Sequence, residues 1–134
     1  GKAKKIFKSF FLKGAKAYIS PSQITHNNPM PEKTLELLQI WDNIFQDKNH
    51  HVIVAEENGE IVSSCVCVII PNLTHNQQPY AFIENVITDE SFRKRGLATR
   101  CLNFAKEIAL KENCYKILPY YPFHSLLNSF YPFF

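Results

Sequence analysis

The stretch Ile83–Arg100 reads IENVITDESFRKRGLATR, and it decides the fold. It begins as a buried strand, passes through a short basic loop with one glycine, and ends as the start of a helix. Free backbone N–H groups at a helix N-terminus favour a bound anion, because the positive end of the helix dipole lies behind them. Arg93, Lys94 and Arg95 add positive charge, and Gly96 lets a ligand approach the backbone closely. The sequence therefore predicts a diphosphate-binding site at this loop.

The pattern Arg93-x-x-Gly96-x-Ala98, placed after a strand and before an amphipathic helix, resembles the acetyl-CoA-binding signature of the GNAT superfamily of N-acetyltransferases. The resemblance extends over about Pro31 to Leu118. It implies an α/β fold in which a mixed, mostly antiparallel sheet carries a parallel strand-helix-strand acetyl-CoA-binding unit and helices cover both faces. It also implies acetyl-CoA as cosubstrate, with pantetheine held by the strand backbone and the diphosphate held by the loop. The residues so assigned are Val86, Ile87, Thr88, Arg93, Lys94, Arg95, Gly96, Leu97, Ala98 and Thr99.

Apolar periodicity places the elements around this unit. The predicted helices are Pro31 to about Asp47 and about Leu97 to Lys111, and the predicted strands are His51–Glu56, Glu60–Ile70, Tyr80–Thr88 and Cys114–Leu118. Asn58-Gly59 predicts an antiparallel hairpin between the first two strands. A right-handed crossover makes the last two strands parallel. The inner stripe predicted for the second helix is Leu97, Cys101, Phe104, Ala105, Ile108 and Ala109.

Acetyl transfer to an amine needs a base, an oxyanion donor and a proton for the departing thiolate. Glu84 is the candidate base, because it stands among apolar residues on a strand where some members of the resembled family carry a catalytic glutamate. A structural carboxylate is an equally good interpretation. A backbone N–H near Val86 or Ile87 is the candidate donor. Tyr131 in Ser129-Phe130-Tyr131 echoes the family's aromatic pair and is the candidate acid, with a role in packing as the alternative.

Composition sets the class of protein. The 134 residues are 46% hydrophobic and 20% charged, which predicts a single domain over 1–134, cytoplasmic and without a membrane span. The resemblance implies that this domain is acetyltransferase-like. The net charge of +3 does not indicate nucleic acid, although lysines crowd the first 16 residues. A weak nucleic-acid binder is therefore the least favoured alternative, because the sequence lacks interleaved aromatic and basic residues. The basic N-terminal segment Lys4–Ser20 departs from the resembled family.

Cysteines and histidines show no spacing typical of a metal site. Cys65 and Cys67 lie two apart on a predicted strand and so face the same side. We expect buried reduced thiols, solvated histidines at His50 and His51, and no metal.

The segment Leu118–Phe134 departs most from the resembled family. It is rich in aromatic residues and leucine, lacks acidic and basic residues apart from His124, and contains three prolines. Such a segment predicts burial over the sheet or in a homodimer interface. The sequence as a whole favours an N-acetyltransferase that acts on a small-molecule or peptide amine. The alternative is an acetyl-CoA-binding module whose turnover is reduced or lost because its C-terminal elements are atypical.

Overall fold

The structure, a computed structural model, describes residues 32 and 34–119. Helix α2 (Leu35–Gln46) comes first, followed by strands β1 (His50–Glu57), β2 (Glu60–Ile70) and β3 (Tyr80–Thr88). A short 3-10 helix η2 (Glu90–Phe92), helix α3 (Leu97–Lys111) and strand β4 (Ile117–Pro119) complete the order. The four strands form one sheet in the order β1-β2-β3-β4. The first two pairings are antiparallel and the β3–β4 pairing is parallel, as predicted.

Local sequence explains several boundaries. Thr34 caps α2, because its hydroxyl oxygen accepts a hydrogen bond from the Leu37 N–H at 3.1 Å. The predicted helix was therefore too long at its N-terminal end, where Pro31 was placed in its first turn. Asn58 and Gly59 both have positive φ, 50° and 78°, which is the geometry of a tight hairpin turn. The predicted hairpin is confirmed.

The last strand begins later than predicted. It covers Ile117–Pro119 rather than Cys114–Leu118, because Asn113 has a left-handed backbone with φ of 57° and the chain turns after α3. The Cys114 N–H still donates to the Ala109 carbonyl, so this residue closes the helix instead of starting the strand.

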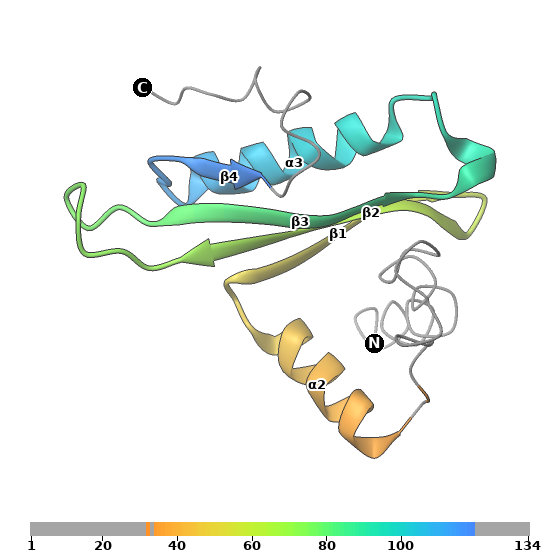
Figure 1. The fold of residues 1–134 in the computed structure, drawn as a ribbon, viewed down its shortest axis with the longest axis horizontal. Helices are drawn as coiled ribbons and strands as arrows, with labels where there is room; N and C mark the ends of the chain where they lie inside the picture. Colours follow the sequence, from red (N-terminus) through yellow and green to blue (C-terminus); the bar gives the residue numbers. More distant parts are fainter. Residues whose placement is uncertain (1–31, 33, 120–134) are drawn as a thin grey trace.

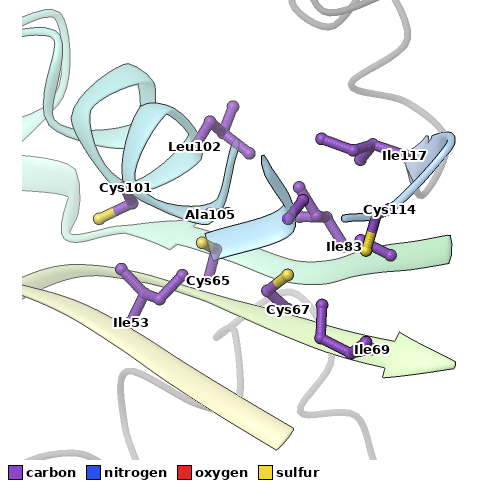
Figure 2. Packing of buried hydrophobic residues seen from close by; sticks show 12 residues of the cluster. Ile53, Cys65, Cys67, Ile69, Ile83, Cys101, Leu102, Ala105, Cys114 and Ile117 are labelled. Atoms are coloured by element: carbon purple, nitrogen blue, oxygen red, sulfur yellow. The ribbon is translucent and has the colours of Figure 1, made fainter. Parts of the chain in front are cut away.

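Helices lie on both sides of the sheet, with α3 on one side and α2 on the other (Figure 1). The core fills the space between α3 and the strands, where Figure 2 shows side chains from both layers meeting. Its members include all four cysteines, and Cys65 and Cys67 are both 0% exposed. The expected buried thiols on one face of β2 are confirmed.

The predicted inner stripe of α3 is partly wrong. Cys101, Ala105 and Ala109 are buried, but Phe104 is 54% exposed and Leu102 is buried in its place. The buried stripe of α3 therefore includes Leu102 in place of Phe104. Among the residues that the structure describes, no helix is long and apolar enough to cross a membrane.

Candidate acetyl-CoA site at the end of strand β3

The candidate site begins with an irregularity in β3. Val66 of β2 pairs with Glu84, but Ser64 pairs with Ile87, so three steps along β3 match two along β2. This is a β-bulge, and Asn85 takes it up with a left-handed φ of 51°. In a regular strand Glu84 and Val86 would share a face. Here they do not, because Val86 packs against the α3-side core while Glu84 lies in register with Val66 on the other face.

The edge of β3 beyond the bulge is not covered by β4. The two strands pair only from Ala81 with Ile117 to Ile83 with Pro119. From Glu84 to Thr88 no strand in the described part of the chain lies on that side. Backbone amides along this edge can therefore bond to an extended ligand in the way a neighbouring strand would. Val86, Ile87 and Thr88, which the resemblance assigned to pantetheine, all lie here.

The basic loop follows after η2 and leads into α3. Lys94 and Gly96 both have left-handed backbones, with φ of 63° and 73°. Turns of this kind direct successive N–H groups into a concave anion site. Gly96 is the N-cap of α3, and the first intrahelical bond joins the Arg100 N–H to the Gly96 carbonyl at 3.1 Å. The N–H groups of Leu97, Ala98 and Thr99 precede that bond and have no intrahelical acceptor.

Gly96 also leaves room for a ligand. A Cβ placed on it would have no atom within 4 Å apart from Gly96 itself and its neighbours in the chain. Side chains from elsewhere in the described structure therefore do not crowd the helix start, where N–H groups are suited to an anion. The predicted loop residues therefore all lie at or directly before the N-terminus of α3.

The two arginines of the loop are held in different directions. Arg93 Nε donates to the Thr88 carbonyl at 3.3 Å, so its side chain folds onto the end of β3. Arg95 instead lies 3.5 Å from a Glu57 carboxylate oxygen and 4.9 Å over the Phe92 ring. Sequence reasoning grouped Arg93, Lys94 and Arg95 as equivalent and missed this division. Only the register of the β1–β2 hairpin brings Glu57 near the loop.

A cavity of about 790 Å³ lies on the hairpin side of the loop, between β1 and α3. Arg95 and Leu97 line it together with Arg100, Cys101, His51 and Glu57. It borders the opposite side of the loop from the free edge of β3. The loop therefore presents one surface to β3 and another to this cavity.

Glu84 is half-buried on the face of the sheet away from α3. His50 shares that face, since it pairs with Val68 and Glu84 pairs with Val66. Burial lowers the pKa of His50 below its ordinary value, the charges of Asp47 and Glu84 oppose that shift, and His51 adds to it. The neutral imidazole is thus the favoured form of His50 on the face that also carries the candidate base.

The expectation of solvated histidines is wrong for this pair. Both residues are half-buried, and the Nε2 atoms of His50 and His51 are buried with no hydrogen-bond partner in the part of the chain that the structure describes. Two adjacent polar residues at the start of an otherwise apolar strand were the only sequence signal of this arrangement. Within residues 32 and 34–119, no group of three His, Cys, Asp or Glu side chains could hold a metal ion. Tyr131, the candidate acid, lies outside the described residues.

Comparison with known proteins gives a consistent result. The profile of the acetyltransferase (GNAT) family matches residues 17–122. A putative acetyltransferase from Agrobacterium tumefaciens str. C58 is 32% identical, with a TM-score of 0.71 over 95% of this chain and 83% of that one. Glucosamine-6-phosphate N-acetyltransferase from Arabidopsis thaliana is 19% identical and has the same fold, with a TM-score of 0.76 over 92% of this chain and 84% of that one.

A glucosamine 6-phosphate N-acetyltransferase from Trypanosoma brucei brucei is 31% identical over 67 residues. That match covers 50% of this chain and 46% of the relative, so the chain spans about half the length of this curated relative.

Proposed function

Because the chain belongs to the GNAT acetyltransferase family, we propose that it transfers the acetyl group of acetyl-CoA to a primary amine. The observation that supports this most directly is the junction of β3 and α3. There the left-handed Gly96 opens the helix start while the neighbouring strand edge from Glu84 to Thr88 is left without a strand in the described chain. One ligand with an anionic group and an amide-bearing arm fits both features.

Different residues would bind the two parts of acetyl-CoA. The N–H groups of Leu97, Ala98 and Thr99, with Lys94 and Arg93, would hold the diphosphate. Within the segment Val86, Ile87 and Thr88, the backbone amides of Val86 and Thr88 would pair with pantetheine. Acetyl-CoA supplies the activated acetyl group when bound, and the chain supplies orientation and proton transfer.

Glu84 is proposed as the base. It would accept the proton from the amine nitrogen as the new N–C bond forms and the C–S bond breaks. Of the two candidate donors Val86 and Ile87, the Val86 N–H would stabilise the charge that develops on the carbonyl oxygen, because the Ile87 carbonyl bonds to Ser63 and so turns Ile87 toward β2. Tyr131 is proposed to donate the proton that the leaving thiolate takes up.

The acceptor is proposed to be the amine of a small molecule or a peptide. Since one relative is a glucosamine 6-phosphate N-acetyltransferase, glucosamine 6-phosphate is the first amine to test. A peptide with a free N-terminus and a lysine-containing peptide with a blocked one complete a minimal panel.

The test is thiol release from acetyl-CoA with each amine. Glu84→Gln should lower kcat by about 100-fold, most strongly at pH values where the amine is mainly protonated, with little change in cofactor affinity. Glu107→Gln, an exposed carboxylate on α3, is the matched control and should leave the rate unchanged. Thiol release that is equal with and without every amine would contradict acetyl transfer. Binding of acetyl-CoA without release would support the alternative of a binding module.

A further inference from the structure

A buried hydroxyl pair joins β2 to the end of β3 beyond the bulge. Ser63 is 1% exposed, and its hydroxyl donates to the Ile87 carbonyl at 3.0 Å. The same oxygen lies 2.9 Å from the Thr88 hydroxyl. A serine hydroxyl has one hydrogen, so with that hydrogen on the Ile87 carbonyl the Thr88 hydroxyl must be the donor to Ser63. The direction of both bonds is thereby fixed.

Ser63 also lies close to Cys101 of α3. Burial raises the pKa of the Cys101 thiol, and the nearby Ser63 side chain opposes that shift. The Ser63 hydroxyl is therefore enclosed between β2, the end of β3 and α3.

This connection lies directly beyond the β-bulge, where the pairing of β3 with β2 resumes at Ile87 with Ser64 and at Thr88 with Ser63. Ser63 adds a side-chain bond to the Ile87 carbonyl, and the Asp89 N–H bonds to the Val62 carbonyl at 2.8 Å. In an antiparallel strand, neighbouring residues direct their amide groups to opposite edges. With Ile87 turned toward β2, the amides of Val86 and Thr88 are turned toward the free edge.

We propose that Ser63 is a positioning residue for acetyl-CoA, which holds the Ile87 peptide so that the adjacent backbone amides face the pantetheine arm. The inference rests on the proposed function, because it assigns that edge to pantetheine. Thr88 supports Ser63 through its hydroxyl. Neither side chain needs to touch the cofactor for this role.

The test compares two ligands by calorimetry on the full chain. Acetyl-CoA carries both diphosphate and pantetheine, whereas ADP carries a diphosphate and no pantetheine. Ser63→Ala should weaken acetyl-CoA binding about tenfold, which is the scale of one lost hydrogen bond that leaves its partner unpaired, and change ADP binding less than about twofold. Thr74→Val is the control, since it removes an exposed hydroxyl from the loop between β2 and β3 at the opposite end of the sheet, and it should change neither affinity.

A second pair of variants keeps the test valid if Ser63→Ala does not fold. Thr88→Val removes the hydroxyl at nearly constant volume and should weaken acetyl-CoA binding about threefold, whereas Thr88→Ser keeps the hydroxyl and should restore it. Equal losses for acetyl-CoA and ADP, or no loss for either, would overturn the positioning role while leaving cofactor binding intact. A parent chain that binds neither ligand would overturn the proposed function and this role together.

Discussion

The Arg95 guanidinium lies 3.5 Å from the Glu57 carboxylate and so ties the basic loop to the β1–β2 hairpin. Both side chains are about half exposed, so the pair itself contributes little stability. The pair instead matters for cofactor binding. Arg95 is predicted to hold the diphosphate, and the Glu57 carboxylate partly neutralises its positive charge.

Removing that carboxylate should therefore strengthen cofactor binding. We expect Glu57→Gln to lower the Kd for acetyl-CoA about twofold to threefold at low salt, with the gain lost at about 0.5 M salt. Calorimetry at two ionic strengths measures this. Arg95→Ala in the Glu57→Gln background should cancel the gain. If the gain survives without Arg95, the two residues are not coupled in the way that the structure indicates.

The pH dependence of stability should reflect His50. Its folded-state pKa is lowered from the ordinary value of 6.5, so the unfolded chain binds a proton more readily. The resulting stabilisation is present above pH 6.5 and is lost as pH falls through the lower folded pKa. Urea unfolding from pH 7.5 to 5 should show this loss, and His50→Gln should flatten the slope. An unchanged slope in that variant would assign the pH dependence to other groups.

The buried thiols give a second pH window at the alkaline end. Burial raises the pKa of Cys67 to about 12 and that of Cys114 to about 11, from an ordinary value of 9.0. Groups with a raised folded pKa stabilise the fold below their unfolded value, and this stabilisation is lost as pH rises through the folded value. We expect the free energy of unfolding to fall between pH 9 and pH 11. Labelling with a thiol reagent at pH 8 should be slow in the native state and fast in urea. Rapid native labelling would contradict the burial of these side chains.

The C-terminal segment supplies a prediction that rests on sequence alone. Residues 120–134 lie outside the described part of the chain, yet their aromatic and leucine content predicts burial. Deleting Ser125–Phe134 should cause aggregation or convert a homodimer to a monomer, as measured by light scattering. An unchanged mass and melting temperature would mean that this segment is not buried.

Sequence patterns located the elements around the site well. The bounds of β3 and α3 match the predicted ones, because the strand's apolar run and the glycine before the helix are strong local signals. The Asn58-Gly59 turn could be predicted because it too has a strong local sequence signal. Each of these features depends on neighbours in the chain.

Features that depend on register could not be predicted. The bulge at Asn85, the bond of Ser63 to the Ile87 carbonyl and the pairing of Arg95 with Glu57 all join segments distant in sequence. Phe104 was misplaced because an apolar residue at the edge of a helical stripe can face either way until the helix is docked. The face shared by His50 and Glu84 likewise follows only from the pairing of three strands.

The most direct test of the proposed diphosphate-binding loop compares two substitutions at Gly96. Asp and Asn are similar in size and both tolerate a left-handed backbone such as the φ of 73° found here, but only Asp places a negative charge at the helix start. Calorimetric titration with acetyl-CoA should show binding to the parent chain, weakened binding to Gly96→Asn and none to Gly96→Asp, with all three chains folded by circular dichroism. Equal affinity of the Asp and Asn variants, or binding by Gly96→Asp as tight as that of the parent, would contradict the assignment of this loop to the diphosphate of acetyl-CoA.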